Sequence, residues 1–406
     1  MYKKLQNPTL PKGYKTNGIA CGLKKVKKDM AIIVSDTLGV SAGTYTTNKV
    51  KAAPVKWDKK LTDNKFKTKA IIVNSGNANA CTSIQGDKDN EDIAIEVAKN
   101  LNCEKENVLV CSTGVIGVPL NMETYKKGIN TIVKTIEDKD ENLNNFNEAI
   151  LTTDTTKKTV SVKTEIDGKE ITITGSAKGS GMIHPNMATM LSFIITDANI
   201  SQKTIQTLLG NTIEDTYNMI SVDGDTSTND TVLVLANGAA KNTEIKKGTK
   251  DFENFKEAFV FVNTYLAKAI VKDGEGASKF IEVIANGAKS KEDAKILVKS
   301  VISSSLVKCA FFGSDANWGR ILCSMGYSDA EFDVDKVSIN FESEFGNINV
   351  VKNGIPINFN EEIAKKILLE KTIKVFITLG DGNSSAKAWG CDLSYDYVKI
   401  NGDYRS

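Results

Sequence analysis

Short apolar runs, each bounded by polar residues or glycines, recur along this chain. Such runs are typical of buried strands, and they occur at residues 69–73, 108–111, 191–195 and 231–235. Two further runs, 159–162 and 170–174, flank Asp167-Gly168, a dipeptide that favours a tight hairpin turn. Apolar residues near helical spacing predict helices, and these cover residues 91–101, 254–271 and 291–302.

The order of these elements indicates the fold class. A regular alternation of strands and helices would indicate a parallel sheet, whereas the irregular order here, interrupted by a hairpin, favours a layered α+β fold. No linker rich in proline or glycine divides the chain. We expect residues 327–357 to begin a smaller C-terminal α/β lobe.

Composition and charge narrow the classes of partner. The 406 residues are 25% charged and 41% hydrophobic, with a formal net charge of +2. This near-neutral balance gives no reason to expect nucleic acid or an acidic membrane as a partner. Seven cysteines without a Cys-x-x-Cys spacing favour a reducing compartment over a disulfide framework or a zinc site. With no apolar run of membrane-spanning length, we expect a cytoplasmic protein.

The chain contains one histidine, His184. Zinc sites with two or three histidine ligands are therefore excluded, and we expect no metal site. Any histidine-based nucleophile would have to use His184, which we expect to be a loop residue rather than a catalyst. A transferase or hydrolase with this composition most simply uses a nucleophile that needs no histidine.

A candidate for such a nucleophile lies where a loop enters a buried strand. The loop over residues 178–190 is rich in glycine, serine and methionine, and it leads into the strand at 191–195 with Thr189 at the junction. If the bond before Thr189 were cut, this residue would carry both a hydroxyl and a free α-amine, and the amine can act as the base. Its pKa of about 7.7–8.0 suits neutral pH. The ordinary alternative is a turn that precedes a strand.

Three other segments carry candidate chemistry, each with a structural alternative. Thr113-Gly114 ends a predicted strand, where a backbone N–H and a hydroxyl could bind an oxyanion, or where the chain simply turns. Residues 151–155 are dense in hydroxyls and could equally cap a helix. Glu275 lies between two glycines, where its carboxylate could bind an ammonium group or stay exposed in a turn.

Residues 221–230 combine acids and hydroxyls, as a calcium-binding loop does. An EF-hand requires a glutamate at the twelfth position, and counting from Asp223 that residue is Val234. The EF-hand interpretation is therefore rejected.

These motifs together resemble the glutamate N-acetyltransferase (ornithine acetyltransferase) family of arginine biosynthesis. The resemblance extends over nearly the whole chain and preserves the order of the motifs. The matching segments are STGVIG at 112–117, TTDT at 152–155, GSGMI and ATML around 179–191, SVDGDTSTND at 221–230, DGEGA at 273–277 and GSDANWGR at 313–320.

The resemblance implies that the precursor cuts itself between Ala188 and Thr189. It implies an α chain of residues 1–188 and a β chain of residues 189–406, which share one folded unit. Thr189 would be the nucleophile, with Thr113 and Gly114 as the oxyanion hole. The implied substrate contacts are Thr152 (with Thr153 as the alternative register), Lys178, Thr189, Glu275, Asn401 and the terminal Ser406.

The chain departs from the family pattern near its end. Ser406 stands where threonine is more usual, and Gly402 stands where alanine is usual. The first change keeps a hydroxyl and the second keeps a small residue, so we expect little functional consequence.

The resemblance also implies the reaction and the assembly. The acetyl group of N-acetyl-ornithine would pass to glutamate through an acetyl-Thr189 intermediate, giving ornithine and N-acetylglutamate without a cofactor. Whether acetyl-CoA also serves as a donor stays open. The fold would be N-terminal-nucleophile-like, and two α and two β chains would assemble. The rival functions are a self-processing amidase or aminopeptidase and a metabolite-binding protein that remains uncleaved.

Overall fold

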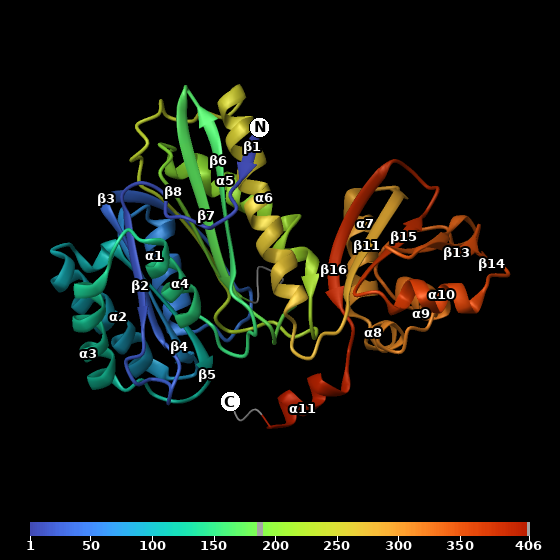
Figure 1. The fold of residues 1–406 in the computed structure, drawn as a ribbon, viewed down its shortest axis with the longest axis horizontal. Coiled ribbons are helices and arrows are strands. Elements are labelled where there is room, and N and C mark those ends of the chain that lie inside the picture. The colour runs from blue at the N-terminus through green and yellow to red at the C-terminus, as the bar shows by residue number, and fades with distance from the viewer. Residues whose placement is uncertain (185–189, 404–406) are drawn as a thin grey trace.

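The computed structural model describes residues 1–184 and 190–403 of the chain. Two β-sheets, of nine and seven strands, form the centres of a large N-terminal lobe and a smaller C-terminal lobe (Figure 1). The layered α+β fold and the smaller lobe agree with the sequence prediction. Among the described residues, no helix combines the length and the apolar character needed to cross a membrane.

The large sheet runs in the order β1-β6-β7-β8-β10-β3-β4-β5, with β2 paired to β3 outside this path. Its strands are β1 (Tyr2–Lys4), β2 (Tyr14–Ile19), β3 (Met30–Tyr45), β4 (Thr68–Asn77), β5 (Val108–Val115), β6 (Lys158–Ile166), β7 (Lys169–Lys178), β8 (Leu191–Thr196) and β10 (Thr231–Ala236).

The long strand β3 belongs to both halves of this sheet. Its residues 40–45 pair with β10, whereas residues 30–34 pair with β2 and β4. The register is interrupted between Val34 and Gly39. Because of this break, the sheet folds over itself, and its two halves face each other across a shared apolar core.

Alternation along β8 shows how the layers form. Leu191, Phe193 and Ile195 join the core between the two sheet halves, whereas Ile194 joins the core on the opposite face. This follows from the two-residue period of a strand. Helices cover both outer faces, with α2 and α3 on β4 and β5, α6 on β6 and β7, and α5 on β3. The lobe is therefore a four-layer α-β-β-α sandwich.

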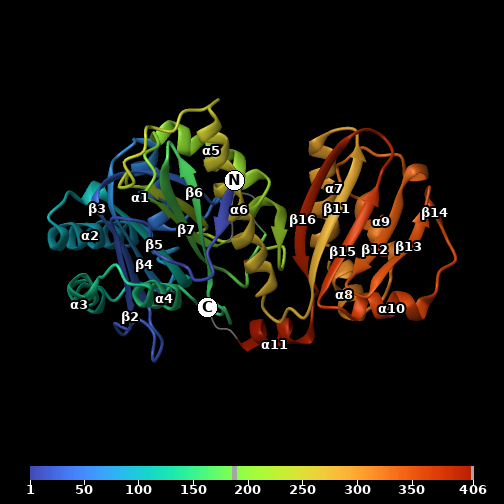
Figure 2. The same cartoon turned by 45° about the horizontal axis from the view of Figure 1, so that its top comes forward.

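The helices of the large lobe are α1 (Ala53–Asp63), α2 (Ser83–Leu101), α3 (Met122–Ile132), α4 (Asp140–Ala149), α5 (Gln202–Glu214) and α6 (Lys250–Lys272). Those of the small lobe are α7 (Lys291–Ser303), α8 (Ser305–Phe312), α9 (Trp318–Gly326) and α10 (Glu361–Leu369). A last helix, α11 (Tyr395–Asp403), extends from the small lobe towards the large one (Figure 2). Short 3₁₀ turns are η1 (Lys105–Asn107), η2 (Val133–Thr135), η3 (Tyr217–Met219) and η4 (Val334–Lys336).

The small sheet begins earlier in the chain than the sequence pattern indicated. Its order is β14-β13-β12-β15-β11-β16-β9. The strands are β9 (Ile220–Ser221), β11 (Phe280–Ala288), β12 (Ser338–Ser343), β13 (Gly346–Lys352), β14 (Ile355–Pro356), β15 (Thr372–Thr378) and β16 (Ser384–Cys391).

The expected start at residues 327–357 is therefore wrong. β11 lies inside the small sheet, where it pairs in parallel with β15 and antiparallel with β16. β9 joins the same sheet through two residues paired with β16 and ties the small lobe to the large one. Such long-range pairings leave no local signal in the sequence.

Most of the predicted elements are present. The hairpin β6–β7 closes through a two-residue turn in which both Asp167 (φ 51°) and Gly168 (φ 65°) have positive φ, as a type I′ turn requires. The helix expected over 91–101 begins earlier, at Ser83. Its first two turns bury only the small or polar residues Gly86, Asp89 and Asn90, so no apolar pattern marks them.

Candidate active site

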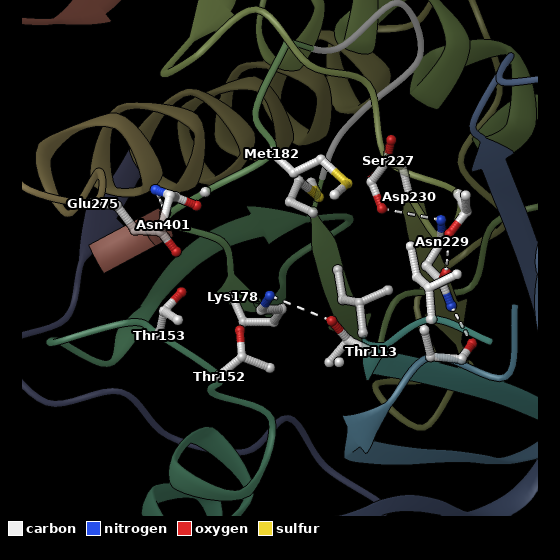
Figure 3. Close-up of a pocket in the computed structure, with 17 residues that line it drawn as sticks. Thr113, Thr152, Thr153, Lys178, Met182, Ser227, Asn229, Asp230, Glu275 and Asn401 are labelled. Atoms are coloured by element: carbon white, nitrogen blue, oxygen red, sulfur yellow. Dashed lines mark hydrogen bonds between the residues drawn. The ribbon is translucent and has the colours of Figure 1, made fainter. Parts of the chain in front are cut away.

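Several of the motifs named in the sequence analysis lie around one cavity of about 290 Å³ in the large lobe (Figure 3). Six residues that the sequence comparison singled out line it, namely Thr113, Gly114, Thr152, Lys178, Glu275 and Asn401. Thr153, the alternative to Thr152, also lines the cavity. Ala188, Thr189 and Ser406 lie outside the described residues. Met190 and Leu191, which open β8, form part of the wall.

One wall is formed where β5 crosses close to β4. Gly114 has φ +130°, and a Cβ there would lie 2.3 Å from the carbonyl carbon of Gly76 and 2.5 Å from the nitrogen of Asn77. Only glycine permits this approach, because real Cβ contacts are longer. The Thr113 hydroxyl accepts a hydrogen bond from the Nζ of Lys178 at 3.4 Å. A hydroxyl and a tightly placed backbone segment therefore border the cavity together.

Among the described residues that line the cavity, the cation is Lys178, the last residue of β7. Burial lowers the pKa of Lys178, and the carboxylates of Asp154, Asp230 and Glu275 act against this shift. Asp154 is outside the cavity lining and accepts hydrogen bonds from the backbone N–H of Gly179 at 2.6 Å and of Thr152 at 3.1 Å.

Burial acts to raise the pKa of Asp154, but nearby lysines and hydrogen bonds outweigh it and lower the pKa to about 2. Asp154 therefore remains ionised close to Lys178.

Glu275 and Asn401 form the opposite side (Figure 3). The N–H of Glu275 donates to the carbonyl of Ser180 at 2.8 Å, and the Asn401 Nδ2 donates to the Glu275 Oε2 at 2.8 Å. At Gly181, a Cβ would lie 2.3–2.5 Å from the Glu275 carboxylate. The glycine-rich loop thus leaves the space that this carboxylate fills, and α11 brings Asn401 against it.

The two candidate threonines differ in their hydrogen bonds. The Thr153 hydroxyl pairs with that of Ser180 at 2.7 Å. The backbone N–H of Thr152 donates to Asp154. The Thr153 hydroxyl is therefore already hydrogen-bonded within the protein.

Sequence reasoning did not single out Asn229 and Asp230 as site residues, yet both line the cavity. The Asn229 Nδ2 donates to the carbonyls of Ala78 at 2.6 Å and Ser112 at 2.8 Å, which joins the 221–230 loop to β5. The signal available in the sequence was the run of acids and hydroxyls at residues 221–230.

The same loop anchors the segment that precedes the expected cleavage point. The Asp223 carboxylate accepts hydrogen bonds from the N–H of Met182 at 2.6 Å, the N–H of Ile183 at 2.7 Å and the hydroxyl of Tyr397 at 3.3 Å. Burial raises the pKa of Asp223. In the described part of the chain, no cluster of three or more His, Cys, Asp or Glu side chains could hold a metal ion.

His184 lies at the far side of this loop. Its Nδ1 is 3.1 Å from the hydroxyl of Ser221 and 3.4 Å from that of Ser303. Burial, with the charge of Lys299 adding to it, lowers the pKa of His184 to about 4. The ring is therefore neutral near pH 7 and takes part in packing and hydrogen bonding.

Comparison with known proteins identifies the family. The model of the ArgJ family matches residues 15–406. Two curated relatives named arginine biosynthesis bifunctional protein ArgJ come from Caldanaerobacter subterraneus subsp. tengcongensis and Thermotoga neapolitana. The first is 52% identical over 397 residues, covering 98% of each chain. The second is 50% identical over 398 residues, covering 98% of this chain and 100% of the relative.

A solved structure agrees with this result. The crystal structure of an arginine biosynthesis bifunctional protein ArgJ from Bacillus halodurans is 45% identical, with a TM-score of 0.51. The match covers 53% of this chain and 100% of that one. The chain therefore belongs to the ArgJ family of arginine-biosynthesis acyltransferases.

Proposed function

We propose that this protein transfers the acetyl group of N-acetyl-ornithine to glutamate and releases ornithine and N-acetylglutamate. The observation that carries the proposal is the single cavity bordered by an uncharged hydroxyl and glycine pair, a buried lysine and a carboxylate. These are the groups that an acetylated amino acid requires. The names of the relatives, which place them in arginine biosynthesis, support the pathway.

Maturation precedes transfer in this proposal. The hydroxyl of Thr189 attacks the carbonyl carbon of Ala188, and the amide becomes an ester as the Thr189 nitrogen takes up a proton. Water then hydrolyses the ester, which leaves a carboxylate on Ala188 and a free α-amine on Thr189. The support is the sequence Ala188-Thr189 at the entrance to β8 and the anchoring of residues 182–183 by Asp223.

Transfer then proceeds in two matched steps. The α-amine of Thr189 accepts the proton of its own hydroxyl as the oxygen attacks the acetyl carbon. Thr113 and Gly114 stabilise the resulting oxyanion. The intermediate collapses, the proton passes to the departing amine of ornithine, and the acetyl group stays on Thr189 as an ester. The α-amine of glutamate attacks this ester by the reverse sequence and leaves as N-acetylglutamate.

Charge complementarity supports N-acetyl-ornithine as the donor. The α-carboxylate common to both amino acids pairs with the ammonium of Lys178. The side-chain ammonium of ornithine pairs with Glu275, whose carboxylate lies across the cavity beside Asn401. Thr152 is a lining residue that offers a hydroxyl to the substrate, and we propose the hydroxyl of Ser406 as a further substrate contact.

We further propose that the reaction needs no cofactor or metal, and that two α chains (1–188) and two β chains (189–406) assemble. The sheet order supports one folded unit shared by the two chains, because β8 and β10 of the β chain lie between β7 and β3 of the α chain. All seven cysteines have free thiols, which supports a cytoplasmic location.

The test follows label from acetyl-labelled N-acetyl-ornithine into N-acetylglutamate. We expect transfer by the wild type and by Thr189→Ser, which keeps the hydroxyl, and none by Thr189→Ala. Thr207→Ala, an exposed threonine on α5, is the matched control and should leave the rate unchanged. Release of free acetate in excess of N-acetylglutamate would instead indicate an amidase, and transfer by Thr189→Ala would overturn the mechanism.

A further inference from the structure

The side chains of Asp154, Lys158 and Asp273 form a buried network of ion pairs, called the bridge here, next to segments that line the cavity. The Nζ of Lys158 lies 2.7 Å from the Asp154 Oδ1 and 2.5 Å from the Asp273 Oδ2. The exposed fractions of the side chains are 1% for Lys158, 0% for Asp154 and 5% for Asp273. Burying three charges costs desolvation free energy that their attraction only partly returns. Stability alone is therefore a weak reason for this arrangement.

Each end of the bridge holds a different wall of the cavity. Asp154 accepts from the N–H of Gly179, and so fixes the backbone directly after Lys178. Asp273 ends α6 and lies two residues before Glu275. Lys158 thus connects the segment that carries Lys178 to the segment that carries Glu275.

Backbone hydrogen bonds make the Asp273 end rigid. Its carboxylate accepts from the N–H of Thr155 at 3.0 Å and of Thr156 at 3.2 Å, and also from the Thr155 hydroxyl. The bridge also joins the two sides of the expected cleavage point, because Asp154 and Lys158 precede it and Asp273 follows it. It would therefore connect the two chains of the mature protein at the site.

We propose that Asp154, Lys158 and Asp273 are positioning residues, and that their bridge sets the spacing between Lys178 and Glu275. This inference rests on the proposed function, in which those two residues bind the ends of the amino-acid substrate. A fixed spacing selects the length of the substrate chain. The bridge then determines the preference for ornithine over lysine, whose side chain is one methylene longer.

The test compares Asp273→Asn with the wild type, both as full-length processed protein. This variant keeps the size of the side chain and one acceptor oxygen, but it removes the charge that holds Lys158. A pocket distinguishes one methylene by roughly 10- to 200-fold. We expect the preference for N-acetyl-ornithine over N-acetyl-lysine to fall about tenfold, with KM raised and kcat kept within about threefold, because binding rather than chemistry is disturbed.

Glu282→Gln is the matched control. Glu282 lies on β11, outside the cavity lining, and its partly buried carboxylate pairs with Lys268 at 3.4 Å. The variant removes this carboxylate. We expect wild-type preference from this variant. Calorimetric titration with ornithine and with lysine gives the same ratio without catalysis. A wild type that binds ornithine but transfers no acetyl group would overturn the proposed function, while the ratio of affinities still tests the bridge.

A second variant covers the case in which Asp273→Asn does not fold or is not processed. Thr155→Val keeps every charge and removes only the hydroxyl that donates to Asp273. We expect a loss of preference in the same direction and about threefold in size. Unchanged preference in a folded, processed Asp273→Asn, or in Thr155→Val where the first fails to fold, overturns the inference.

Discussion

Replacing Gly114 with alanine perturbs the candidate oxyanion hole without removing any polar group. The new Cβ would lie 2.3 Å from the carbonyl carbon of Gly76, whereas ordinary van der Waals contact begins at 3.4 Å. Both contact atoms of β4 are backbone, so no side chain can rotate away. The strands must separate by about 1 Å at this point. The φ of +130° adds strain for any residue with a Cβ.

The effect on stability and activity follows from this displacement. Overpacking and positive φ together predict a loss of about 2–4 kcal/mol in the free energy of unfolding. A shift of about 1 Å in a group that stabilises the transition state predicts a fall of roughly 100-fold in kcat. The assay measures ornithine release from N-acetyl-ornithine in the presence of glutamate, with the melting temperature recorded alongside.

Gly117→Ala is the matched control. Gly117 also has positive φ, at +80°, but a Cβ there meets nothing within 4 Å. We expect a loss of about 1 kcal/mol in stability and nearly normal kcat for this variant. If kcat of Gly114→Ala stays within about threefold of the wild type, or if Gly117→Ala loses as much activity, the reasoning about Gly114 is refuted.

Three further predictions concern the opposite wall and the loop. Asn401→Ala removes the hydrogen bond to Glu275 and should raise KM for N-acetyl-ornithine about fivefold with kcat unchanged, as steady-state kinetics would measure. Asp223→Asn weakens the anchoring of residues 182–183 and should slow self-cleavage about tenfold, measured by intact mass over time. The folded pKa of His184, about 4, lies below the unfolded 6.5, so its stabilising contribution is complete above pH 6.5 and is lost as the pH falls towards 4. The loss in the free energy of unfolding reaches about 3 kcal/mol and should shrink in His184→Gln.

Each of these predictions has a control. Val398→Ala, an exposed change on the same helix as Asn401, should leave KM unaltered, and an equal rise in KM would remove the assigned role of Asn401. Asp36→Asn, an exposed aspartate on β3 outside this loop, should be processed at the wild-type rate. An acid profile of His184→Gln that superimposes on the wild-type profile would contradict the assignment of that titration to His184.

Local sequence patterns predicted much of the fold. The hairpin β6–β7 was predictable down to its turn, because Asp167-Gly168 decides the geometry within two residues. The central strand β8 was predictable because its apolar run is too short for a buried helix and follows a glycine-rich loop. The position of β11 was not predictable, because its neighbours β15 and β16 lie about 90–110 residues further along the chain.

The site was predictable in parts only. Resemblance singled out Thr113, Gly114, Lys178, Glu275 and Asn401, which line one cavity. Local pattern alone gave Thr113-Gly114 and Glu275 an ordinary structural alternative each. Their convergence depends on contacts between segments far apart in sequence, which no local pattern encodes.

The roles of Asp223 and Asp154 show the same limit. An aspartate that accepts two backbone N–H groups 40 residues away looks like any loop acid in the sequence. Asp154 and Asp273 become partners only because Lys158 lies between them in the folded chain.

The most direct test of the account is the intact mass of the denatured protein after mixing with N-acetyl-ornithine alone. The account predicts two chains that meet at Ala188 and Thr189, with one acetyl group added to the chain that begins at Thr189 and one equivalent of ornithine released. Adding glutamate should remove the acetyl group. A single full-length chain, or a cleaved protein that transfers acetyl groups without ever carrying one, would contradict the central claim.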